Sequence, residues 1–128
     1  MVTIIDDRAS GDSLRSFKVA VPSHRSTVRE IIRARVREEV ERFNQKSGEV
    51  FHGLVQPNDS EPAGDGYRLP RLRTLDWQQQ YDRAITAFQQ NGFFVICDDK
   101  QIDDLDQIVE LTEKTEVHFL KLVPLVGG

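Results

Sequence analysis

Residues 116–128 read EVHFLKLVPLVGG, and this stretch decides the fold that we predict. Glu116 to Val123 alternate apolar side chains with polar or smaller ones, which predicts a long final strand. The strand runs directly into Pro124-Leu125-Val126-Gly127-Gly128. Pro124 favours an extended lead-in because its φ is fixed and it has no backbone N–H. Gly127 and Gly128 have no Cβ, so their backbone can enter a channel too narrow for other residues. We therefore predict a folded body over residues 1–122 and a flexible C-terminal tail over residues 123–128.

The segment before this strand is also strand-like. Residues 93–97, FFVIC, form a continuous apolar run that is typical of a strand buried on both faces. Asp98-Asp99-Lys100 predicts a turn. A short segment around Asp103-Asp104-Leu105-Asp106 follows, and residues 112–115 predict a second turn before the final strand.

The N-terminal part predicts a hairpin and a long helix. Val2–Asp6 and Phe17–Val21 have strand periodicity, and a Gly-containing turn at residues 8–13 separates them. Thr27 and Glu30 have the spacing of a capping box at a helix start. We predict a helix over about residues 27–45, whose apolar residues recur at helical spacing. These residues are Val28, Ile31, Ile32, Val36, Val40 and Phe43.

The middle of the chain predicts an insertion at about residues 47–91. Val50–Val55 is apolar enough to pack locally, whereas Gln56–Gly66 is rich in Pro, Gly and polar residues and predicts an exposed, mobile loop. Asp76 or Thr74 can cap a second helix that ends at Asn91-Gly92. Its predicted inner face carries Trp77, Tyr81, Ala84, Ile85 and Phe88.

This order of elements resembles the β-grasp fold of the ubiquitin-like superfamily. The ending is similar to that of the sulfur-carrier proteins of molybdopterin and thiamin synthesis, which also have an acidic segment like residues 102–106, an acidic turn and a strand leading to Gly-Gly. The strand 17–21 followed by residues 27–31 is similar to the strand-to-helix connection of the superfamily. The resemblance covers about residues 14–46 and 92–128. Residues 47–91 exceed a minimal β-grasp domain, and in this respect the chain resembles the enlarged ubiquitin-like modifiers of bacteria.

The resemblance implies an α+β fold, with a mixed sheet packed on one long helix and a second helix in the insertion. It also implies a ubiquitin-like modifier, not an enzyme, whose Gly128 carboxylate is adenylated by an activating enzyme that uses ATP and Mg²⁺. The acyl group would then pass to a cysteine thioester and to a target amine, with a conjugating enzyme and a deconjugating protease as further partners. Gly127 and Gly128 would be the activation site, and Pro124, Leu125 and Val126 would present it.

Two alternatives stay open at this point. The same tail suits a sulfur carrier that forms a C-terminal thiocarboxylate. A non-covalent β-grasp adaptor would instead bind through its sheet face or through the second helix. Asp103, Asp104 and Asp106 are candidate docking residues for a basic surface of the activating enzyme, although ordinary turn chemistry also accounts for them.

Composition and residue spacing argue against several other classes of function. The net charge is −4, which gives no overall basic field for nucleic acid. Cys97 is the sole cysteine and lies in an apolar run, so we expect an inert buried thiol and a reducing, cytoplasmic compartment. His24, His52 and His118 lack metal-ligand spacing, so we predict no metal site and no bound cofactor. No apolar run is long enough to span a bilayer. The sequence offers no nucleophile with a matching base, so we predict no catalytic residues.

Overall fold

The computed structural model describes residues 1–45, 50–64, 66–69 and 74–122. It contains two helices, α1 (Val28–Gln45) and α2 (Trp77–Gln89). Nine strands complete the described part of the chain: β1 (Val2–Asp7), β2 (Ser13–Val19), β3 (Arg25–Thr27), β4 (Glu61–Ala63), β5 (Gly66–Arg68), β6 (Phe93–Cys97), β7 (Lys100–Ile102), β8 (Ile108–Glu110) and β9 (Glu116–Lys121). The predicted α+β class is confirmed.

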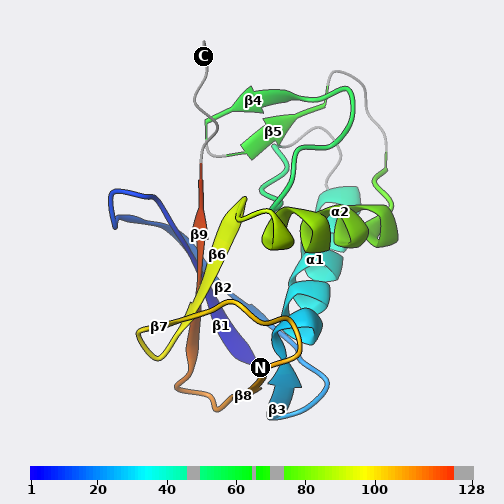
Figure 1. Cartoon of the computed structure of the whole chain (residues 1–128). Coiled ribbons are helices and arrows are strands. Elements are labelled where there is room, and N and C mark those ends of the chain that lie inside the picture. Colours follow the sequence, from blue (N-terminus) through cyan, green and yellow to red (C-terminus); the bar gives the residue numbers. More distant parts are fainter. Residues whose placement is uncertain (46–49, 65, 70–73, 123–128) are drawn as a thin grey trace.

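The main sheet has five strands in the order β2-β1-β9-β6-β7. β1 and β9 lie side by side and parallel, with Ile4 opposite Val117, whereas the other neighbouring strands are antiparallel. The first and last strands of the described chain are therefore adjacent inside one mixed sheet, which packs against α1 (Figure 1). This arrangement is consistent with the β-grasp expectation.

The start of α1 follows the predicted capping box. The backbone N–H of Glu30 donates to Thr27 Oγ1 and the backbone N–H of Thr27 donates to Glu30 Oε1, each at 3.1 Å. These bonds satisfy backbone donors that a helix start leaves without partners. All six residues of the predicted apolar stripe are buried.

The second helix is also confirmed. Asp76 caps it, because its carboxylate accepts a hydrogen bond from the backbone N–H of Gln78 at 3.0 Å. Asn91 has a positive φ of 59° and the Gly92 N–H donates to the carbonyl of Ala87 at 2.7 Å, which ends the helix as predicted. Of the predicted inner face, Ala84 and Phe88 are buried and the other three side chains are half-buried.

Two element predictions need correction. Gln56–Gly66 is not simply an exposed loop: β4 and β5 pair as a small antiparallel hairpin, with Pro62 opposite Tyr67. The backbone of Phe51 bridges to Tyr67, so the apolar segment before the hairpin ties it to the core. β6 is not buried on both faces, because its side chains alternate between buried and half-buried positions. Only the α1 side of the sheet is fully covered, which leaves the outer side of β6 accessible.

Candidate functional site

The predicted activation site lies outside the described residues. Gly127 and Gly128, together with the presenting residues Pro124, Leu125 and Val126, follow the last described residue, Leu122. The structure places the end of β9, which precedes this segment in the sequence.

The base of the tail is the end of β9, one of the inner strands of the sheet. Lys121 is opposite Phe93 of β6. The backbone N–H of Leu122 donates to the Gly92 carbonyl at 3.4 Å, and Lys121 Nζ donates to the Gly53 carbonyl at 3.3 Å. The strand end is therefore held by the neighbouring strand and by the insertion.

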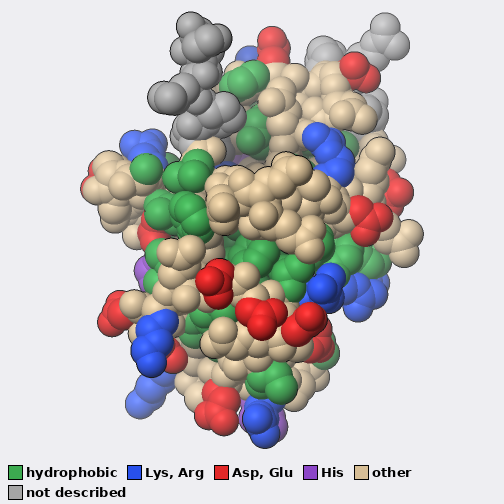
Figure 2. Space-filling view, in the orientation of Figure 1, with side chains coloured by type: hydrophobic (Ala, Val, Ile, Leu, Met, Phe, Trp, Pro, Cys, Tyr) green, Lys and Arg blue, Asp and Glu red, His purple; other side chains and the backbone are tan. Residues whose placement is uncertain are grey.

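The outer face of the sheet, turned away from α1, is largely apolar next to this base. Ile5, His118 and Ile96 lie in one cross-strand row, and Asp7, Leu120 and Phe94 lie in the next. These side chains are half-buried, and the exposed Leu122 follows them. Figure 2 shows hydrophobic side chains gathered on the left of the molecule, near the upper end of β9. We name Ile5, Phe94, Ile96 and Leu120 the outer apolar face.

A polar group lies within this outer apolar face. His118 Nδ1 is 2.7 Å from Asp7 Oδ2, and Ser13 Oγ donates to Asp7 Oδ1 at 3.0 Å. His118 Nε2 is 3.9 Å from Glu116 Oε1. The Ser13 hydroxyl binds the Asp7 carboxylate and not the His118 imidazole. The three residues therefore do not form a catalytic triad, in which the hydroxyl contacts the imidazole and the imidazole contacts the carboxylate. The strand alternation that turns Asp7 and His118 to the same side of the sheet brings these polar side chains together.

The acidic residues Asp103, Asp104 and Asp106 form an exposed loop between β7 and β8. Asp104 Oδ1 accepts a hydrogen bond from the backbone N–H of Asp106 at 2.9 Å, and Arg29 Nε lies 3.4 Å from Asp106 Oδ1. The loop also caps α1, because the backbone N–H of Arg29 donates to the Leu105 carbonyl at 2.9 Å. Turn chemistry and helix capping account for these residues, and a docking role for them stays a prediction.

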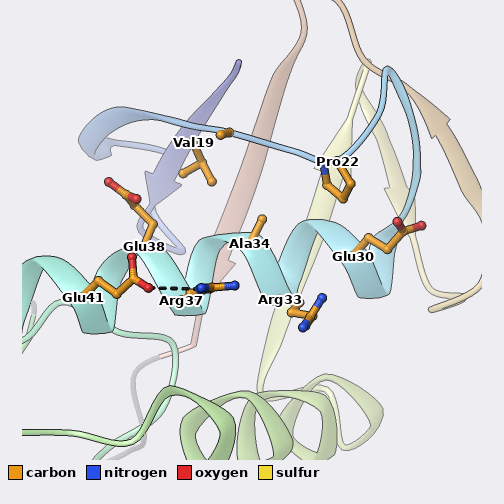
Figure 3. A pocket seen from close by; sticks show the side chains of 9 residues that line it. Val19, Pro22, Glu30, Arg33, Ala34, Arg37, Glu38 and Glu41 are labelled. Atoms are coloured by element: carbon orange, nitrogen blue, oxygen red, sulfur yellow. Dashed lines mark hydrogen bonds and ion pairs between the residues drawn. The ribbon is translucent and has the colours of Figure 1, made fainter.

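A shallow groove of about 260 Å³ runs along α1 beside the end of β2. Figure 3 shows Ala34 pointing from α1 toward the segment that carries Val19 and Pro22. The charged side chains at its rim are already engaged: Arg37 pairs with Glu41 at 3.0 Å, and Glu38 pairs with Arg42 at 2.8 Å. The groove therefore offers little uncompensated charge to a ligand.

Other chemistries find little support in the described part of the chain. Cys97 is buried, and its burial raises the pKa of the thiol to about 11, so the thiolate is scarce at neutral pH. No cluster of three or more His, Cys, Asp or Glu side chains that could hold a metal ion occurs among the described residues. Within the same residues, no helix is long and apolar enough to cross a membrane.

No family model, no curated protein and no solved structure matches this chain.

Proposed function

We propose that the chain is a ubiquitin-like modifier of the β-grasp class, and that its reactive group is the Gly128 carboxylate. The observation that carries the proposal is the position of β9. This strand lies beside the first strand inside the sheet, in parallel, and ends at Lys121, seven residues before Gly128 in the sequence. The proposal requires a free carboxylate at Gly128, whether the chain is made with that end or trimmed to it.

The chemistry needs a partner because a carboxylate is a poor electrophile. A Gly128 oxygen would attack the α-phosphorus of ATP, and the bond to the bridging oxygen would break so that pyrophosphate leaves. A partner thiolate would then attack the acyl carbon and AMP would leave. Finally, a target amine would displace the thiolate and lose a proton, which forms an amide. Mg²⁺ and the ATP site belong to the activating enzyme in this scheme.

The chain's own contribution is presentation. The end of β9 is fixed at Lys121 and Leu122, so the residues after it start from a defined point. The outer apolar face lies beside this point and offers half-buried aliphatic and aromatic surface for the activating enzyme. Burial of such surface contributes about 25 cal/mol per Å². Pro124 and the two glycines suit entry of an extended backbone into a narrow channel.

The test uses the full chain with a fluorescent label at its N-terminus, incubated with ATP in an extract of the cells that make it. We expect a thiol-sensitive adduct and a ladder of thiol-resistant conjugates, both absent for the chain that lacks Gly127-Gly128. An identical ladder from the shortened chain would overturn the proposal. If instead the intact mass of the unlabelled chain shows one oxygen replaced by sulfur and no ladder forms, the chain is a sulfur carrier.

A further inference from the structure

The insertion between the helices contains a compact unit beside the base of the tail. We name residues 50–64 and 66–69 the insert platform. Its centre is Phe51, which is 2% exposed and packs edge-on against Phe43 of α1 with 5.5 Å between ring centroids. The backbones of Phe51 and Tyr67 exchange two hydrogen bonds of 2.8 Å each, which join the segment to the β4–β5 hairpin. The insert platform is therefore an ordered part of the fold.

Three cationic side chains from the body of the protein hold the insert platform by its backbone. The His52 carbonyl accepts hydrogen bonds from Arg15 Nη2 of β2 at 3.2 Å and from Arg35 Nη2 of α1 at 3.4 Å. The Gly53 carbonyl accepts from Lys121 Nζ of β9 at 3.3 Å. These bonds join the insert platform to the sheet and to α1, so its position relative to β9 is defined.

This position is close to any enzyme that holds the reactive end. Lys121, whose ammonium group contacts the insert platform, is seven residues before Gly128 in the sequence. A fully extended chain covers at most about 3.5 Å per residue, so Gly128 lies within about 25 Å of Lys121. Figure 1 shows the β4–β5 hairpin at the same end of the molecule as the end of β9. An enzyme that encloses Gly128 and also contacts the end of β9 would have the insert platform beside its surface, because Lys121 contacts Gly53.

The exposed surface of the hairpin has a specific charge pattern. Glu61 and Arg68 are directly opposite each other in the β4–β5 register, and both are exposed. Pro62 beside Glu61 is exposed as well and fixes its own φ. An anion and a cation that face each other across the two strands of the hairpin can be matched by a cation and an anion on a partner.

We propose that the activating enzyme recognises the insert platform, with a basic side chain facing Glu61 and an acidic side chain facing Arg68. This inference rests on the proposed function and deepens it. The tail would supply the reacting group, and the insert platform would distinguish this chain from carriers that end in Gly-Gly but lack the insertion. A charge mismatch at such a surface weakens encounter and docking without altering the bound carboxylate.

The test exchanges the two charges, Glu61→Arg with Arg68→Glu, which keeps both the cross-strand pair and the net charge. The matched control exchanges the adjacent exposed residues of the turn before β9, Glu113→Lys with Lys114→Glu. The readout is the initial rate of ATP-dependent conjugate formation by labelled full chain in the cell extract, measured against chain concentration. We expect the half-saturating concentration to rise about ten-fold for the Glu61/Arg68 exchange, with the maximal rate within about two-fold. The control exchange is expected to match the wild type.

The possible outcomes separate this inference from the proposed function. If the exchange leaves the half-saturating concentration unchanged while removal of Gly127-Gly128 still abolishes conjugation, the insert platform is not the recognition surface and the modifier function stands. If the wild type itself forms no adduct, both proposals are overturned. Circular dichroism and the urea midpoint check that the exchanged variant is folded. Should it not fold, the neutral pair Glu61→Gln with Arg68→Gln replaces it, with the same criterion.

Discussion

Arg35 of α1 and Asp6 of β1 form a buried ion pair between the helix and the sheet. Both guanidinium Nη atoms donate to the Asp6 carboxylate, one of them at 2.8 Å to Oδ2. Both residues are 0% exposed. The guanidinium also lies over the Phe119 ring, 4.6 Å from its centroid. Because each charge is desolvated and each has its partner, the pair fixes how α1 sits on β1 and β9.

We expect removal of Asp6 from this ion pair to destabilise the folded state. Asp6→Asn removes the carboxylate that binds both Nη atoms of Arg35 and leaves the buried guanidinium with the more distant Glu39 carboxylate, at 3.9 Å. We therefore expect the free energy of unfolding to fall by about 3–5 kcal/mol in urea denaturation. Arg37→Ala removes an exposed partner of Glu41 that also lies over the Trp77 ring, 5.3 Å from its centroid, and should cost about 1 kcal/mol or less. A loss below about 1 kcal/mol for Asp6→Asn would show that the pair does not hold the layers together. The double variant Asp6→Val with Arg35→Met should regain part of the loss, since it removes this buried pair and leaves the buried Glu39 carboxylate with Arg15 as its cation.

Asp6 and Glu39 are expected to give opposite pH dependences. Burial raises the pKa of Asp6, but the charge of Arg35 and its hydrogen bonds outweigh this, so the pKa lies below the ordinary 3.8. The stabilisation from Asp6 is therefore present above pH 3.8 and is lost as the pH falls through the lower folded value. Burial raises the pKa of Glu39 above the ordinary 4.5 against the lowering effect of Arg35 and Arg15. The folded state then binds this proton more readily, and Glu39 gives a gain in stability as the pH falls toward 4.5.

The free energy of unfolding, measured as a function of pH, tests the expectations for Asp6 and Glu39. In Glu39→Gln the gain on acidification toward pH 4.5 should be smaller than in the wild type. In Asp6→Asn the loss below pH 3.8 should be smaller. Parallel wild-type and variant curves across both ranges would contradict the assignment of these shifts.

The capping box of α1 predicts a modest and local effect. Thr27→Ala removes the hydroxyl that accepts the Glu30 N–H at 3.1 Å, so we expect a loss of about 1 kcal/mol in the free energy of unfolding. Thr27→Ser keeps the hydroxyl and serves as the control, with a loss of at most a few tenths of a kcal/mol. Equal losses in the two variants would assign the effect to the Thr27 methyl group and not to the cap.

Sequence periodicity predicted the elements around these residues because burial imposes a helical or alternating pattern. Helical spacing predicted the buried stripe from Val28 to Phe43. Residue type at the helix starts predicted the cap residues Thr27 and Asp76. The burial of Arg35 and Glu39 was not predicted, because a pattern of apolar residues does not include charged side chains. Arg35 is four residues after Ile31 and Glu39 is four after Arg35, so both lie on the buried stripe. Asp6 continues the buried positions Val2 and Ile4 of β1 in the same way.

The insertion was less predictable because its order comes from long-range contacts. Its Pro- and Gly-rich composition is typical of a loop, and the pairing of Phe51 with Tyr67 spans residues with no common periodicity. The carbonyl contacts from Arg15, Arg35 and Lys121 involve three separate elements, which no local pattern indicates. For the candidate site, the sequence indicated the strand that leads to the tail but not the insert platform beside it.

Gly53 is expected to be essential for the packing of the insert platform. A Cβ at this position would overlap the Phe51 ring, so Gly53→Ala must displace a ring that is buried in the core. We expect a loss of about 1–3 kcal/mol in the free energy of unfolding and faster amide exchange at Phe51 and Tyr67, which share the backbone bridge. A loss under about 0.3 kcal/mol with unchanged exchange would mean that this close packing does not hold the platform.

The outer apolar face yields a prediction that separates docking from folding. Phe94 is half-buried on the side of the sheet away from α1 and is opposite Leu120 in the register of β6 and β9. If the activating enzyme covers this face, Phe94→Ser removes buried aromatic area from the complex but little from the core of the free protein. We expect the half-saturating concentration in the conjugation assay to rise at least about ten-fold, which corresponds to about 1.4 kcal/mol. The free energy of unfolding should fall by about 2 kcal/mol or less, since the side chain is only partly buried on this face. The control is Ile108→Ser, which removes an exposed apolar side chain from β8, outside the main sheet. A conjugation curve for Phe94→Ser that coincides with that of Ile108→Ser would exclude this face from docking, because both variants lose exposed apolar surface but only one loses it next to the base of the tail.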